Sequence, residues 1–81
     1  MGKLRIISHL GDTVVEWEKD LAEKGDAEAQ EAVKEAERIF EEQLRRGATA
    51  FQAAPGTQAK RLEHFDPEAD QVVIVPRVVG G

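Results

Sequence analysis

The chain has 81 residues, of which 41% are hydrophobic and 33% charged, and its formal net charge is −5. This describes one small globular domain, too short to hold a catalytic domain with a deep cleft, and the negative charge argues against non-specific nucleic-acid binding. Cysteine is absent, which excludes disulfides, thiolate metal sites and a cysteine nucleophile. No apolar run reaches the length of a membrane span and no signal peptide is evident, so the default expectation is a cytoplasmic protein without a membrane partner.

The N-terminal part of the chain has the pattern of a β-hairpin. Residues 3–8 and 13–17 are two short runs rich in β-branched and aliphatic side chains, separated by a turn that contains Gly11. The side chains expected to face the core are Leu4, Ile6, Val15 and Trp17. Burying Trp17 is expected to need a one-residue adjustment of the hairpin register.

One long amphipathic helix is expected at residues 27–46. Its apolar stripe consists of residues spaced 4, 3, 4 and 4 apart, namely Ala29, Val33, Ala36, Phe40 and Leu44. Asp26 is expected to cap the amino end, and Gly47 to end the helix in a left-handed conformation. The charged connection before it, residues 18–25, has room for one helical turn.

Two weaker strand candidates follow the helix. Residues 48–54 alternate, and Phe51 is expected to face the helix, whereas residues 58–63 form a second, weaker run. Asp66 followed by proline predicts one tight turn before the last strand, and Phe65 is expected to fix that loop to the core.

The last strand candidate passes directly into the C-terminal tail. Residues 72–75, Val-Val-Ile-Val, match a buried strand, and Pro76 ends the ladder because it has no backbone N–H to donate. Extended backbone over residues 77–81 would carry the terminal carboxylate about 16 Å beyond the domain. Gly80 and Gly81 have no Cβ atoms, so they can enter a narrow channel in another protein.

The element order predicts an α+β domain in which a mixed sheet of four to five strands packs on one long helix. Residues 1–75 are expected to form this domain, and residues 76–81 an extended tail. No internal repeat or linker is evident in the sequence.

In this order the chain resembles the β-grasp proteins of the ubiquitin superfamily, which include ubiquitin-like modifiers and the sulfur carriers of molybdopterin and thiamine biosynthesis. The residues that carry the resemblance are Leu4-Arg5-Ile6-Ile7, the Gly11 turn, Thr13-Val14-Val15 and the run from Val72 to Gly81. The resemblance implies a ubiquitin-like β-grasp fold.

It also implies a function for the tail. The Gly81 carboxylate, preceded by Gly80, would be adenylated by a partner activating enzyme that uses ATP, and would then become a thiocarboxylate or the donor end of an isopeptide bond. Arg77 corresponds to a tail arginine that the activating enzyme of ubiquitin reads. Pro76 and the aliphatic pair Val78-Val79 look more like the sulfur carriers, so the sequence leaves both branches open. The chain would bind no cofactor itself, and its partners would be an adenylating enzyme and either conjugation targets or a sulfur acceptor.

A second hypothesis is a non-covalent adaptor with an idle tail. Alternation places four aliphatic side chains on the sheet face away from the helix, where they are expected to form a partner surface: Ile7, Val14, Val73 and Val75. A small enzyme is the least favoured class, because no nucleophile, base and orienting group converge in the sequence. His9 and His64 lie in separate loops, so no metal site is expected. The surface lysines are possible acceptors for a second copy, namely Lys3, Lys19, Lys24, Lys34 and Lys60.

Overall fold

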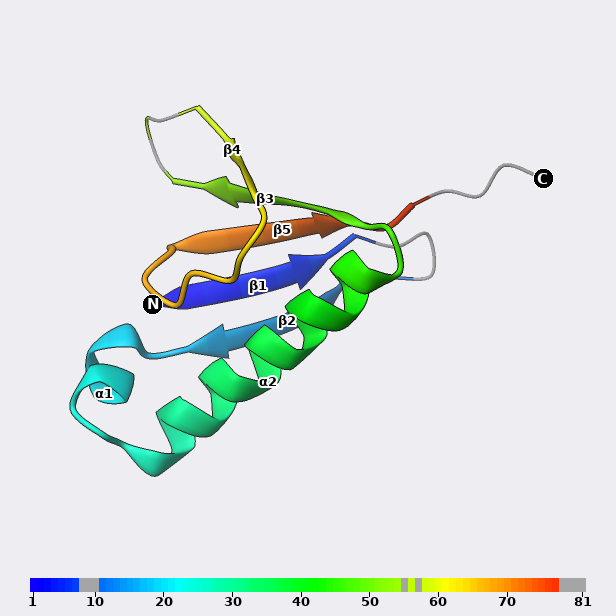
Figure 1. Cartoon of the computed structure of the whole chain (residues 1–81). Helices are drawn as coiled ribbons and strands as arrows, with labels where there is room; N and C mark the ends of the chain where they lie inside the picture. The colour runs from blue at the N-terminus through cyan, green and yellow to red at the C-terminus, as the bar shows by residue number, and fades with distance from the viewer. Residues whose placement is uncertain (8–10, 55, 57, 78–81) are drawn as a thin grey trace.

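The computed structural model describes residues 1–7, 11–54, 56 and 58–77. In this part of the chain, a five-stranded sheet with the strand order β2-β1-β5-β3-β4 is covered on one face by helix α2 (Figure 1). The elements are β1 Gly2–Ile6, β2 Thr13–Trp17, α1 Lys19–Glu23, α2 Ala27–Arg45, β3 Thr49–Ala53, β4 Lys60–Leu62 and β5 Gln71–Val75. Within the described residues, no helix is both long and apolar enough to cross a membrane.

The sheet is mixed, with its last strand at the centre. Strand β5 pairs in parallel with β1 on one side and antiparallel with β3 on the other. The connection through α2 joins the outer strand β2 to β3, which run in the same direction on opposite sides of the central pair. The expectation of a mixed α+β sheet packed on one long helix is confirmed, and the arrangement is compatible with a β-grasp fold.

The β1–β2 hairpin has a regular register, because Gly2 has no side chain and leaves space for the Trp17 ring. The Cα of Gly2 pairs with that of Trp17, and Leu4 pairs with Val15, so the predicted one-residue adjustment is wrong. A Cβ atom on Gly2 would stand 2.1 Å from Cε2 of Trp17, which shows that the indole lies over the bare glycine backbone. Trp17 is 2% exposed, and its Nε1 donates a hydrogen bond to the carbonyl oxygen of Pro67 at 3.0 Å.

Helix α2 begins after the predicted N-cap, Asp26, and ends before the predicted left-handed glycine, Gly47. The Asp26 carboxylate accepts a hydrogen bond from the Ala29 N–H at 3.0 Å, as expected for an N-cap. At the other end, Gly47 has φ +95°. The N–H groups of Gly47 and Ala48 donate to the carbonyl oxygens of Leu44 and Gln43, both at 3.0 Å, which is the paired pattern of a Schellman motif.

The core lies between α2 and the sheet. Its fully buried side chains are Leu4, Ala36, Phe40, Ala50, Ala69, Val72 and Ile74. The loop before β5 closes one end of this core through Phe65, whose ring centroid lies 5.5 Å from that of Trp17 and 5.8 Å from that of Phe40. The prediction that Phe65 fixes this loop is therefore confirmed.

The predicted orientation of β3 is wrong. Ala50 faces the helix and is fully buried, whereas Phe51 is half-buried on the opposite face of the sheet. The register explains this, because Ala50 pairs with the buried Ile74, and the next residue must point the other way. On that opposite face Phe51 pairs with Val73 of β5 and Arg61 of β4.

Candidate functional site

The start of the C-terminal arm is the first part of the candidate site. The chain leaves β5 from the middle of the sheet, and Pro76 and Arg77 follow outside the strand, with Pro76 half-buried and Arg77 exposed (Figure 1). A Cβ atom on Gly47 would stand 3.2 Å from Cδ of Arg77, so the arginine side chain passes over the glycine that ends α2. The negative end of the helix dipole favours a guanidinium at this position.

The remaining tail residues of the prediction are Val78, Val79, Gly80 and Gly81. They lie outside the described residues, so the roles given to them stay predictions. The structure bears on the tail only through the strand that carries it and through the contact of Arg77 with Gly47.

The second part of the candidate site is the sheet face away from α2. One row of paired residues crosses all five strands there, in the order Val14, Arg5, Val73, Phe51 and Arg61. A second row holds Ile7 and Val75, because the Ile7 N–H continues the β1–β5 ladder to the Ile74 carbonyl oxygen at 3.0 Å.

Together Ile7, Val14, Phe51, Val73 and Val75 form what we call the outer-face patch. The exposed fractions of Ile7, Val14 and Val75 are 46%, 45% and 41%. The four aliphatic residues predicted for a partner surface therefore share one face, and an apolar surface of this kind is typical of a docking site. Phe51 was missed because it was expected to face the helix.

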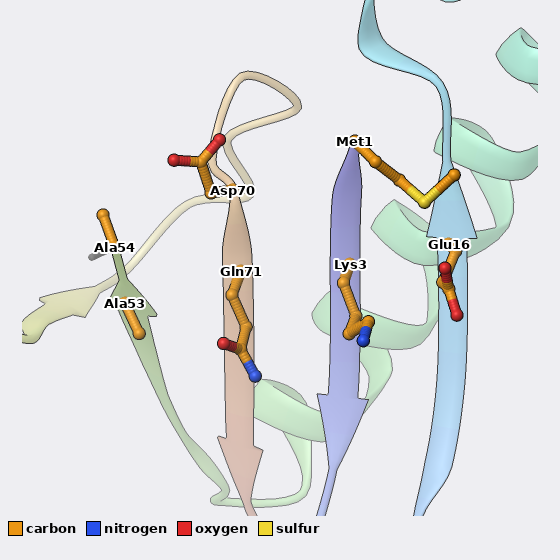
Figure 2. A pocket seen from close by; sticks show the side chains of 7 residues that line it. All are labelled: Met1, Lys3, Glu16, Ala53, Ala54, Asp70 and Gln71. Atoms are coloured by element: carbon orange, nitrogen blue, oxygen red, sulfur yellow. The ribbon is translucent and has the colours of Figure 1, made fainter.

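Polar side chains occupy the other end of the same face. An open hollow of about 550 Å³ lies there. Figure 2 shows the side chains that line it, namely Met1, Lys3, Glu16, Ala53, Ala54, Asp70 and Gln71. Lys3 and Glu16 are cross-strand partners with opposite charges. The lining thus combines charged and amide side chains with the apolar side chains of Met1, Ala53 and Ala54.

An ion pair beside this hollow ties α1 to the start of β5. Nζ of Lys19 donates to Oδ1 of Asp70 at 2.5 Å and to the Glu68 carbonyl oxygen at 3.2 Å. The hydrogen bond from Lys19 lowers the pKa of the Asp70 carboxyl, and the same bond raises the pKa of Lys19. Of the five candidate acceptor lysines, Lys19 is the one whose ammonium is held in this way by described residues.

No metal ligands gather in the part of the chain that the structure describes, where no three His, Asp or Glu side chains meet in a group. His64 is exposed, and His9 lies outside the described residues.

Comparison of the chain with protein-family models, with curated proteins and with solved structures finds no match in any of the three.

Proposed function

We propose that the chain is a ubiquitin-like carrier or modifier whose Gly81 carboxylate is activated by a partner enzyme. The observation that supports this best is the position of β5. It is bonded on both sides within a sheet compatible with a β-grasp fold, and the chain leaves it at Pro76, five residues before Gly81. A rigid base with a short tail suits delivery of a carboxylate into the active site of another protein.

The proposed chemistry takes place in the partner. The Gly81 carboxylate attacks the α-phosphate of ATP, which forms an acyl adenylate and releases pyrophosphate. A sulfur or amine nucleophile then attacks the acyl carbon and releases AMP. Because glycine has no side chain, neither attack meets a steric obstacle next to the reacting carbon.

Arg77 is the described residue best placed for recognition by that enzyme. Its side chain is exposed beside the end of α2, at the base of the tail. An acidic pocket on the activating enzyme would pair with the guanidinium through strong charge-assisted hydrogen bonds. Replacing Arg77 with alanine should therefore raise the KM for adenylation and leave the fold intact.

The test uses purified protein whose intact mass shows that it ends at Gly81. It is incubated with adenylating enzymes and ATP, and pyrophosphate release and product mass are followed. A sulfur-for-oxygen mass gain identifies a carrier, whereas covalent ladders on other proteins identify a modifier. Glu37→Gln serves as the control because Glu37 is exposed on α2, and equal reactivity of protein lacking Gly81 refutes the proposal.

The outer-face patch favours a second candidate, a non-covalent adaptor. In that case Val73→Asp or Phe51→Asp abolishes binding of a partner, and deletion of Gly80 and Gly81 leaves it unchanged. The opposite result, loss of binding with the deletion alone, would contradict the adaptor and support a function that depends on the tail.

A further inference from the structure

A small open groove is lined by residues of β2, α1 and the start of α2, together with Met1. These elements meet at the end of the domain opposite the start of the arm (Figure 1). The volume of the groove is about 200 Å³. The apolar side chains that line it are Met1, Trp17, Leu21, Ala29 and Ala32. Two of them, Met1 and Leu21, are 61% and 44% exposed, so the groove presents large apolar side chains to solvent.

The rim of the groove is negatively charged. Four exposed carboxylates from three neighbouring parts of the chain line it, namely Glu16, Glu18, Asp26 and Glu28. The lining contains no lysine or arginine side chain, and its one positive group is the α-amino group of Met1.

Two of these four carboxylates have a neighbouring partner, since Glu16 lies opposite Lys3 in the β1–β2 ladder and Asp26 caps α2, but none of the four forms an ion pair among the described residues. The ion pairs among the described residues join Arg5 to Asp12, Lys19 to Asp70, Arg38 to Glu35 and Glu42, and Arg46 to Glu42. None of them uses a rim carboxylate. Because exposed charges act over a Debye length of about 10 Å at 0.1 M salt, neighbouring carboxylates on so small a rim add their potentials.

We infer that this groove docks a basic segment of a partner protein, with one aliphatic or aromatic side chain on the apolar floor and lysine or arginine on either side. At about 200 Å³ the groove is smaller than most small-molecule sites, which usually measure about 300–1,000 Å³. Its volume instead suits one anchoring side chain. The rim repels acidic segments, and the floor gives a simple cation nothing to bind. The charge is complementary to a basic peptide.

The neighbouring groove between α1, α2 and the loop before β5 shows why the rim matters. It is also partly apolar, but its lining holds two lysines, Lys19 and Lys34, and two glutamates, Glu23 and Glu68. That mixture of charges favours neither an acidic nor a basic partner segment. The acid-rimmed groove is also distant from Arg77, so a partner held there leaves the arm accessible, and the inference does not depend on activation of Gly81.

The probe for the test is a fluorescein-labelled peptide of nine residues with a central leucine, two arginines on each side and serine at the ends. Binding is followed by fluorescence anisotropy at low salt and at 0.3 M salt. Leu21→Ser removes part of the floor, and the pair Glu18→Gln and Glu28→Gln removes half of the rim charge. Glu37→Gln is the matched control, since Glu37 is exposed on α2 and does not line the groove.

We expect Leu21→Ser to weaken binding about fivefold, because the variant lacks the exposed half of the leucine side chain that the peptide would otherwise bury. The double rim variant should weaken binding about threefold or more, since each exposed charge pair contributes modestly. Glu37→Gln should leave affinity within about 1.5-fold of the parent protein, as should deletion of Gly80 and Gly81.

Three results overturn the inference. The first is an equal loss with Glu37→Gln, which indicates attraction to the acidic domain as a whole. The second is unchanged binding when the leucine of the peptide is replaced by alanine. The third is self-association that Leu21→Ser abolishes in sedimentation equilibrium, which assigns the groove to a second copy of the chain. All substituted side chains are exposed, and Trp17 fluorescence reports whether each variant is folded.

Discussion

Gly47→Ala tests the junction between helix α2 and the arm. Gly47 has φ +95°, a region that an alanine enters only with strain. Left-handed backbone costs a residue with a Cβ roughly 1–2 kcal/mol, and Gly47 lies beyond the centre of that region, so we expect the upper part of the range. The added methyl would also meet Cδ of Arg77 at 3.2 Å, a contact that a flexible side chain relieves at small cost.

Gly25→Ala is the matched control for this prediction. Gly25 has φ +92° with nothing within 4 Å of an added Cβ, so it reports the backbone strain without a neighbour. The difference between the two variants isolates the contact with Arg77, and we expect it to be a few tenths of a kcal/mol and to vanish in an Arg77→Ala background.

The assays are urea and thermal denaturation, both followed by the fluorescence of the single tryptophan, which is 2% exposed and therefore sensitive to unfolding. A loss of 1–2 kcal/mol should lower Tm by roughly 4–16 °C in a domain of this size. A cost below about 0.5 kcal/mol for Gly47→Ala would refute the left-handed end of the helix. A large coupling with Arg77 would show instead that the start of the arm is held rigidly.

Three further predictions concern the fold. Gly2→Ala should destabilise the domain by at least about 2 kcal/mol in the same assay, because the methyl would stand 2.1 Å from the Trp17 ring, and a neutral result would show that the indole does not lie there. Phe40→Ala should cost about 3–5 kcal/mol and Phe51→Ala about half as much, since only Phe40 is fully buried, and equal losses would contradict the assigned faces. The Asp70 pKa is lowered by its hydrogen bond with the α1 ammonium, so its carboxylate stabilises the fold above the unfolded pKa and loses this effect as the pH falls through the folded pKa. The Tm difference between parent and Asp70→Asn should therefore be constant from about pH 7 to 5 and shrink as the pH falls below the ordinary carboxyl pKa, and a difference that grows on acidification would reverse the assigned sign.

Local signals in the sequence were enough to place helix α2. Its ends depend on Asp26 and Gly47, whose capping and left-handed roles need no information from the rest of the chain. Strand β2 was also placed correctly, because short β-branched runs between turns have few alternatives.

Features that depend on pairing across the sheet were harder to predict. The large apolar side chain of Phe51 predicted a position in the core, but the register with β5 puts Ala50 in the core instead. The regular hairpin depends on Gly2, whose missing side chain leaves space for Trp17 in a way that no periodicity shows. The acid-rimmed groove had no signal in the sequence, because only the fold brings Glu16 beside Asp26.

The central place of β5 has a consequence for synthesis on the ribosome. No ladder joins β1 directly to β3, so a nascent chain that has not yet exposed residues 71–75 can form hairpins but cannot complete the sheet. Pairing of strands so distant in sequence is slow compared with local folding. A prematurely terminated product without β5 would thus stay open to proteases, and folded copies that lack the base of the arm should not accumulate.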